Sequence, residues 1–127
     1  MYKKRILIID DEEHFCNLVK KNIEQTGEFE VHIATNGDDG IRLTREVNPD
    51  LILLDVVMPG MDGGDVASLI RNDESIKDIP IVFLTAIVEK GEVDSQASFT
   101  KGYSLLSKTV TIAELIACIK KNVRIRA

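Results

Sequence analysis

The sequence LILLDVVMPGMDG at residues 51–63 decides the fold that we predict for this chain. Its first four residues form an apolar run, which is typical of a strand buried on both faces of a parallel sheet. Asp55 follows this run directly, so its carboxylate is expected at the carboxyl edge of the sheet, where open α/β sheets bind ligands. The Pro-Gly and Asp-Gly pairs that follow indicate sharp turns, which leave the acid exposed at a loop mouth.

A second strand-like run, RILII at residues 5–9, also ends in acids, because the sequence DDEE follows it at residues 10–13. If the two strands are parallel neighbours, Asp10, Asp11 and Asp55 converge on one spot. Carboxylates that lie so close together cannot all stay ionised without a cation, so the cluster predicts a bound divalent metal. The alternative is an acidic first turn that complements a helix N-terminus, and this explanation is expected to hold for Glu12 and Glu13.

The composition is that of an ordinary globular protein, with 44% apolar and 29% charged residues in 127. We predict a single domain over residues 1–127, with its core at about 4–124. The net charge of −5 argues against nucleic acid as a primary ligand, because such binding depends on neutralising phosphates. The apolar stretch near the N-terminus is too short for a signal peptide or a membrane span.

The two cysteines, Cys16 and Cys118, lack the spacing of a metal site, and both fall in segments with helical periodicity. They are interpreted as core thiols of a protein in the reducing cytoplasm, with a disulfide as the alternative.

Strand and helix signals alternate five times along the chain. Strands are predicted at residues 6–9, 31–34, 51–54, 81–84 and 105–106. Helices are predicted at 13–26, 38–47 and 64–72, in a short form within the polar stretch 89–101, and after Thr111, which is expected to cap the last helix. The apolar spacing directs Leu18 of the first helix and Leu69 of the third toward the core. Five such units imply a parallel sheet covered on both faces.

Polar residues follow four of the predicted strands. Asp10 and Asp11 follow the first, Asp55 the third, Thr85 the fourth, and Lys108 comes just after the fifth. Because the carboxyl ends of parallel strands share one edge of a sheet, four separate strands are each expected to supply part of a single site.

These motifs resemble those of the response-regulator receiver domain, the phospho-accepting module of two-component signalling. The resemblance covers nearly the whole chain and is carried by IIDDE at 8–12, LLDVVMPGMDG at 53–63, PIVFLTA at 80–86, and Lys108 after LLS at 105–107. It implies an α/β, flavodoxin-like, doubly wound sheet of five parallel strands in the order 2-1-3-4-5, with helices on both faces.

The resemblance also implies a role for each residue of the site. Asp55 would be the phospho-acceptor, and Thr85 and Lys108 would contact the phosphoryl oxygens. Asp11, Asp55 and the backbone carbonyl of Val57 would bind Mg²⁺ directly, with Asp10 acting through a water molecule.

The implied function is that of a signalling switch and not of an enzyme, since the chain would catalyse only its own phosphorylation and dephosphorylation. The expected partners are a sensor histidine kinase or phosphotransfer protein and a downstream protein or effector domain. A homodimer is possible, whereas direct binding to nucleic acid or membrane is not expected.

The sequence departs from the usual receiver pattern beside the site. Thr109 replaces the usual proline after Lys108, and we predict a trans peptide between the two. Leu105 stands where an aromatic residue is usual, so we expect the switch to run mainly through residues 89–101. Val57 and Ile87 flank the entrance and are apolar, which favours a long-lived phosphoryl group.

Three other functions are alternatives to a phospho-accepting receiver. A pseudo-receiver that never takes phosphate is kept open by Leu105 and Thr109. A phosphohydrolase of the haloacid dehalogenase type also uses an aspartyl nucleophile, but no second acid follows Asp55 as a general base. An FMN binder of the flavodoxin type is disfavoured, because no phosphate-binding loop follows Ile9.

Overall fold

A computed structural model describes residues 3–86 and 103–125 of the chain. The described residues contain a five-stranded parallel sheet in the order β2-β1-β3-β4-β5. Its strands are β1 (Lys4–Ile9), β2 (Phe29–Ala34), β3 (Leu51–Asp55), β4 (Ile81–Thr85) and β5 (Ser104–Ser107). This strand order confirms the flavodoxin-like sheet that the sequence predicts.

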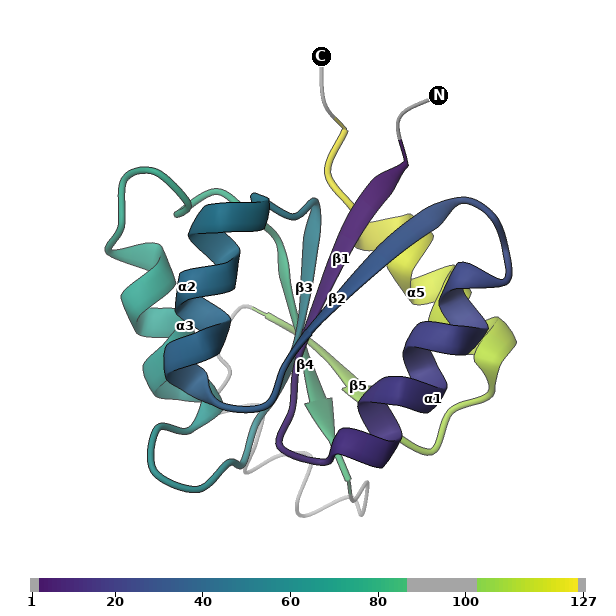
Figure 1. Cartoon of the computed structure of the whole chain (residues 1–127), viewed down its shortest axis with the longest axis horizontal. Helices are drawn as coiled ribbons and strands as arrows, with labels where there is room; N and C mark the ends of the chain where they lie inside the picture. The colour runs from purple at the N-terminus through teal and green to yellow at the C-terminus, as the bar shows by residue number, and fades with distance from the viewer. Residues whose placement is uncertain (1–2, 87–102, 126–127) are drawn as a thin grey trace.

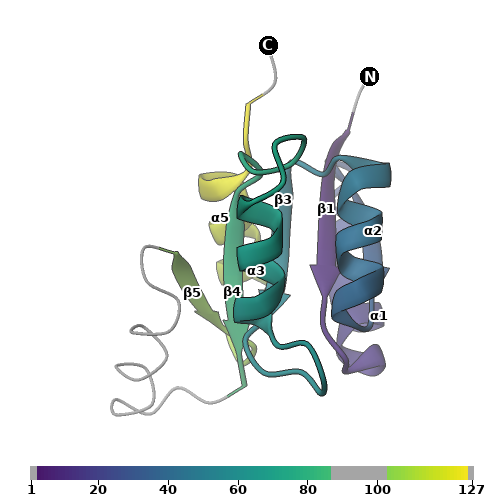
Figure 2. The same cartoon turned by 90° about the vertical axis from the view of Figure 1, so that its left-hand side faces the viewer.

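Helices cover both faces of the sheet, as Figures 1 and 2 show. The described helices are α1 (Glu13–Glu24), α2 (Gly37–Val47), α3 (Gly63–Arg71) and α5 (Ile112–Asn122). In Figure 1, α2 and α3 lie on one side of the sheet, and α1 and α5 lie on the other. Right-handed crossovers between parallel strands produce this two-sided arrangement.

The sheet interior consists of aliphatic side chains that alternate between its two faces. From β3, Ile52 and Leu54 pack into the core under α2 and α3, whereas Leu51 and Leu53 pack into the core under α1 and α5. All five residues of β3 are buried, as expected for a central strand covered on both sides. The buried strand therefore holds Asp55, at its last position, in a fixed place.

The predicted helix faces were wrong at Leu18 and Leu69. Leu18 and Leu69 are 60% and 47% exposed, although the apolar spacing directed both toward the core. Smaller side chains occupy the inward positions instead, namely Cys16 in α1 and Ala67 in α3. The leucine of each helix lies outside these inward positions and remains in contact with water.

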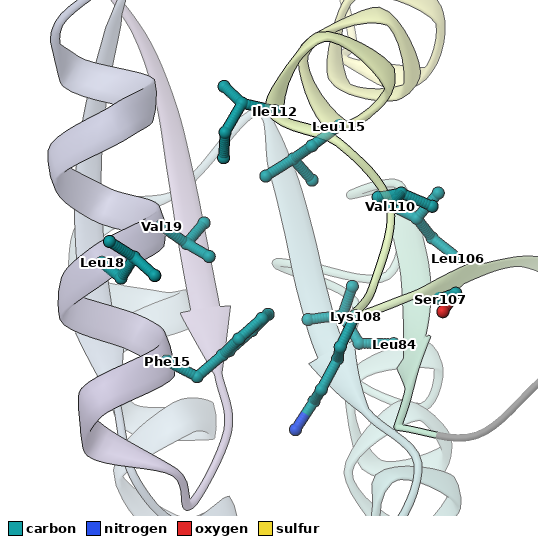
Figure 3. Close-up of a pocket in the computed structure, with 10 residues that line it drawn as sticks. All are labelled: Phe15, Leu18, Val19, Leu84, Leu106, Ser107, Lys108, Val110, Ile112 and Leu115. Carbon is teal, nitrogen blue, oxygen red and sulfur yellow. The ribbon is translucent and has the colours of Figure 1, made fainter.

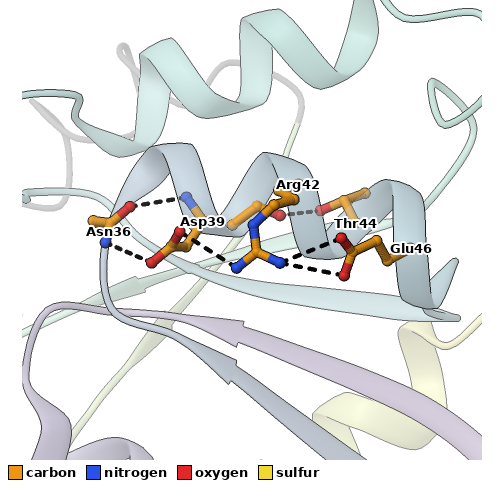
Figure 4. A network of polar contacts seen from close by, with 6 residues as sticks. Asn36, Asp39, Arg42, Thr44 and Glu46 are labelled. Carbon is orange, nitrogen blue, oxygen red and sulfur yellow. Dashed lines mark hydrogen bonds and ion pairs between the residues drawn. The ribbon is translucent and has the colours of Figure 1, made fainter.

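The polar surface of α2 is a self-contained network of side chains (Figure 4). Asn36 caps the helix by accepting a hydrogen bond from the Asp39 N–H at 2.8 Å. Arg42 then pairs with Asp39 and Glu46, one helical turn away on either side. These acids thus have partners within their own helix, which separates them from the acids at the strand ends.

Some sequence predictions lie outside the described residues, namely the short helix within 89–101 and the position of Ile87. In the part of the chain that is described, no helix combines the length and the apolar character needed to cross a lipid bilayer.

Candidate functional site

Strand pairing brings the three acids together at the carboxyl edge of the sheet, the lower edge in Figures 1 and 2. Ile9 of β1 pairs with Leu54 of β3, so the next residues, Asp10 and Asp55, emerge side by side. Asp11 follows at the start of the loop into α1. Asp10, Asp11 and Asp55 each present a carboxylate oxygen within 4.8 Å of the others, as the sequence predicts.

The three carboxylates differ in their environment. Asp10 and Asp55 are buried, whereas Asp11 is exposed. One oxygen of Asp10 accepts a hydrogen bond from the Glu12 N–H at 2.9 Å, and one oxygen of Asp55 lies 3.4 Å from the Val57 N–H. Backbone groups therefore orient the two buried acids, and the exposed acid faces the solvent from which a cation would arrive.

Lys108 reaches the acids from the segment that follows β5. Its Nζ atom lies 2.6 Å from Asp10 Oδ2 and 3.5 Å from Asp55 Oδ2, and only 7% of its side chain is exposed. The contact with Asp10 is an ion pair without hydrogen-bond geometry, because Oδ2 accepts no well-aligned hydrogen bond within the described residues. One ammonium group thus faces several carboxylates, and negative charge remains in excess.

Burial and the neighbouring charges shift the pKa values of Asp55 and Lys108. Burial raises the pKa of Asp55 to about 7, and the neighbouring charge of Asp10 adds to this effect, whereas Lys108 opposes it. Burial would lower the pKa of Lys108, but its close contacts with Asp10 and Glu12 and the charge of Asp55 raise the pKa above its ordinary value. Lys108 therefore stays protonated, while Asp55 resists ionisation in the absence of a further cation.

The loop after Asp55 folds back onto its own strand. The Gly63 N–H donates to the Val56 carbonyl at 3.0 Å, and a Cβ atom at Gly63 would collide with the Asp55 carbonyl oxygen. Gly60 supplies the turn with a φ of 76°, in the region that favours glycine. The two glycines allow α3 to begin directly against the backbone of the proposed phospho-acceptor.

The segment around Lys108 is held by hydrogen bonds on both sides. The Lys108 N–H donates to the Thr85 carbonyl at 2.8 Å, which ties it to the end of β4. The Thr109 N–H donates to Ser107 Oγ at 3.1 Å, and the two hydroxyl groups lie 2.7 Å apart. The Lys108–Thr109 peptide is trans, as predicted, because the described residues contain no cis peptide.

Leu105 departs from the receiver pattern, and an aromatic residue, Tyr103, packs close to it. Leu105 is partly buried and packs against the core under α2 and α3. Tyr103 packs its ring edge-on against Phe83, with the centroids 5.2 Å apart, and the Arg71 guanidinium lies 5.2 Å from the centre of the Tyr103 ring. The aromatic ring near β5 therefore belongs to Tyr103, two residues before Leu105.

Sequence reasoning missed two side chains that contact Lys108. Glu12, which was assigned to the helix dipole, accepts a hydrogen bond from Lys108 Nζ at 2.6 Å. The ring centre of Phe15 lies 4.8 Å from the same nitrogen. Both residues lie near the start of α1, so the sequence shows that they are close to Asp10 and Asp11. Nothing in the sequence links them to a lysine almost one hundred residues away.

Comparison with known families supports one assignment for this arrangement. The model of the family described as response regulator receiver domain matches residues 6–120. A curated relative, the DNA-binding dual master transcriptional regulator RpaA of Synechocystis, is 37% identical over 122 residues. That match covers 94% of this chain but 49% of the relative, so the chain spans about half the length of the curated protein.

Solved structures with this fold include chemotaxis and receiver proteins. The chemotaxis protein CheY4 of Vibrio cholerae has a TM-score of 0.80 at 21% identity, with 94% of this chain and 98% of that chain covered. The N-terminal domain of a response regulator receiver protein from Methanoculleus marisnigri has a TM-score of 0.68 at 26% identity, with 96% and 98% covered. The similarity to CheY4, at such low identity, speaks for the fold alone.

Proposed function

The chain belongs to the response regulator receiver domain family, and from this premise we propose that it accepts a phosphoryl group on Asp55 in a Mg²⁺-dependent reaction. The observation that carries the proposal is the convergence of Asp10, Asp11 and Asp55 within 4.8 Å, with the Lys108 ammonium beside them. These groups come from the ends of three different strands. Such an arrangement suits the transfer of a charged group, which needs a nucleophile and cations at one point.

The chemistry of the cluster fits Mg²⁺. Its donors are all oxygens, Asp10 Oδ2 accepts no well-aligned hydrogen bond in the described part of the chain, and burial together with the charge of Asp10 raises the pKa of Asp55 despite the nearby Lys108. We propose that Asp11, Asp55 and the Val57 carbonyl would hold the ion, with Asp10 acting through water. When bound, Mg²⁺ would neutralise charge and favour the ionised form of Asp55.

In the proposed step, an ionised oxygen of Asp55 attacks the phosphorus of a donor phosphohistidine in line. A phosphorus–oxygen bond forms while the phosphorus–nitrogen bond breaks. The electron pair stays with the imidazole nitrogen, which then takes up a proton from solvent. Lys108 contributes a fixed positive charge, and the Thr85 hydroxyl would donate a hydrogen bond to a phosphoryl oxygen.

A receiver needs a phosphodonor and a target. We propose that a sensor histidine kinase or a phosphotransfer protein supplies the phosphoryl group, and that a conformational change then alters the affinity for a downstream protein or effector domain. RpaA is a longer, DNA-binding protein, and this chain corresponds to about half of it.

No observation in the described residues favours a pseudo-receiver. Leu105 and Thr109, the residues that kept this alternative open, both lie in well-packed or hydrogen-bonded positions, and neither disturbs the group of Asp10, Asp55 and Lys108. We therefore propose a phospho-accepting receiver and no second function.

The test of this proposal is incubation with acetyl phosphate and Mg²⁺, followed by intact mass spectrometry. We expect one added phosphoryl group on the wild-type chain, none after Asp55→Asn, and a strongly reduced amount after Asp11→Ala. Labelling that persists in the Asn variant would show that Asp55 is not the acceptor, and labelling that proceeds equally well in a chelator would show that the reaction does not need Mg²⁺.

A further inference from the structure

Lys108 is held by an acid that does not belong to the proposed metal site. Its Nζ atom lies 2.6 Å from Glu12 Oε1 but 3.5 Å from Asp55 Oδ2. The Lys108 ammonium group thus lies closer to Glu12 than to Asp55, the acid whose phosphoryl group it is expected to contact. A phosphoryl group on Asp55 would have to compete for this ammonium group.

Glu12 differs from the other two partners of Lys108 in its freedom to move. The side chains of Asp10 and Asp55 are 0% and 8% exposed, whereas that of Glu12 is 58% exposed. A buried carboxylate that lost its partner would carry the full cost of burial, but an exposed carboxylate can turn into water. Glu12 is therefore the partner that Lys108 can release at the lowest cost.

The side chain of Glu12 does not cap α1, the helix that begins at the next residue. Glu12 occupies the N-cap position of α1, yet its side chain makes no capping hydrogen bond. The other described helices are capped by Asn36, Asp62 and Thr111, residue types that suit this position. Glutamate is a poor N-cap, so the residue forgoes a capping interaction and contacts Lys108 instead.

The surroundings of Lys108 restrict where its ammonium group can go. Its side chain lines an apolar pocket of about 150 Å³ between α1 and α5, together with Phe15, Leu84 and Leu106 (Figure 3). Figure 3 shows the charged end reaching past the Phe15 ring, toward the end of the pocket. The pocket walls are mostly apolar, and within the described residues the ammonium group forms its ion pairs with Asp10, Glu12 and Asp55 at this end.

We propose that Glu12 is a positioning residue that holds Lys108 in a resting position, and that Lys108 leaves Glu12 when a phosphoryl group occupies Asp55. The inference rests on the proposed function. It adds that the Glu12 carboxylate competes with the phosphoryl group for Lys108. Glu12 lowers the affinity of the site for a phosphoryl group, because part of the gain from the new ion pair is spent in breaking the old one.

The experiment measures the binding of beryllofluoride, a phosphoryl mimic, in the presence of Mg²⁺. Glu12→Gln removes the charge, and Glu12→Asp keeps the charge on a side chain one methylene shorter. We expect both variants to bind beryllofluoride about two- to fivefold more tightly than wild type, the size expected for an ion pair with one solvent-exposed partner. The matched control is Glu13→Gln, which removes an equal charge from the next, exposed residue, and we expect its affinity to stay near that of wild type.

A second measurement follows Lys108 itself. The ¹⁵N resonance of its ammonium group should shift in Glu12→Gln and Glu12→Asp without any ligand, and the wild-type resonance should shift on binding of beryllofluoride. Thermal unfolding checks that each variant is folded.

The outcomes separate two kinds of failure. If wild type binds no beryllofluoride, the proposed function fails. The inference is overturned if wild type binds beryllofluoride and Glu12→Asp binds it with the same affinity as wild type. It is also overturned if Glu13→Gln raises the affinity as much as Glu12→Gln does, because the contact with Lys108 would then have no role.

Discussion

At the scale of single residues, the site combines buried acids with too few cations. Asp10 and Asp55 are buried next to each other, and Lys108 is shared among Asp10, Glu12 and Asp55. Such crowding costs stability in the resting protein, and this cost is the reason that the site would bind a cation or a phosphoryl group.

The pKa of Asp55 leads to a prediction about stability in the absence of divalent metal. Its native value is about 7, and its ordinary value is 3.8, so the native state binds more protons than the unfolded state between these pH values. The stability contributed by the protonated carboxyl is present below pH 4 and is lost as the pH rises through 7. We therefore expect Asp55→Asn to be more stable than wild type by about 2–4 kcal/mol at pH 8, with a smaller difference at pH 5.5.

Urea unfolding in a chelator at the two pH values measures this difference. Asp78→Asn, which removes the same charge from an exposed residue, serves as the control and should change little. Equal stabilities of wild type and Asp55→Asn at pH 8 would show that Asp55 ionises in the native state without strain.

At the scale of elements, the start of α3 and the end of β3 form one packed unit. Gly63 is the first residue of α3, and it donates to Val56, the residue that follows Asp55. The capping box formed by Asp62 and Asp65 fixes the same helix end. A change at the start of α3 is thus transmitted directly to the backbone of Asp55.

Gly63→Ala tests this coupling, because two physical effects predict opposite signs. Helix propensity alone would favour alanine over glycine, by up to about 1 kcal/mol. The added Cβ would collide with the Asp55 carbonyl and approach Val56 Cα to 3.1 Å, and backbone cannot move aside easily. We expect a net destabilisation of about 1–3 kcal/mol, measured by urea unfolding, together with slower phosphorylation by acetyl phosphate. An increase in stability would mean that the loop is free to shift.

At the scale of the whole molecule, the candidate site lies at the carboxyl edge of the sheet, and polar contacts at the opposite edge hold the C-terminal segment to the sheet. Asp50, at the start of β3, is buried and accepts a hydrogen bond from the Arg5 N–H at 2.9 Å. Arg124 pairs with the same carboxylate at 3.5 Å and donates its backbone N–H to the Asp50 carbonyl. The segment after α5 is therefore tied to β1 and β3 at the edge opposite the site.

A metal bound at the site is expected to stabilise the whole domain. A ligand that binds only the native state shifts the folding equilibrium by mass action, by about 1.4 kcal/mol at ten times its Kd. For a protein of this size, this stabilisation corresponds to an increase in Tm of roughly 4–7 °C. We expect such an increase for wild type in millimolar Mg²⁺, and a much smaller one for Asp11→Ala. Identical shifts in the two proteins would point to a nonspecific effect of salt.

The sequence alone determined the sheet and the three-acid cluster. The apolar runs before Asp10 and Asp55 are long and uninterrupted, so they are buried strands in any parallel arrangement, and the residue after each run lies at the carboxyl edge. Local periodicity predicts each strand and places each acid at a strand end. It does not say which strands are neighbours, so the strand order was predicted from the resemblance to receiver domains.

Only the tertiary structure decided how the helices face the core and which partners Lys108 has. Periodicity shows which side of a helix is apolar, but that side is several residues wide. The packing of neighbouring elements determines that Cys16 is buried and that Leu18, on the same helix, is exposed. Glu12 and Lys108 are separated by 96 positions in the sequence and meet because β1 and β5 end at the same edge. Long-range contacts of polar side chains leave no periodic signal, because they depend on the packed geometry of the whole sheet.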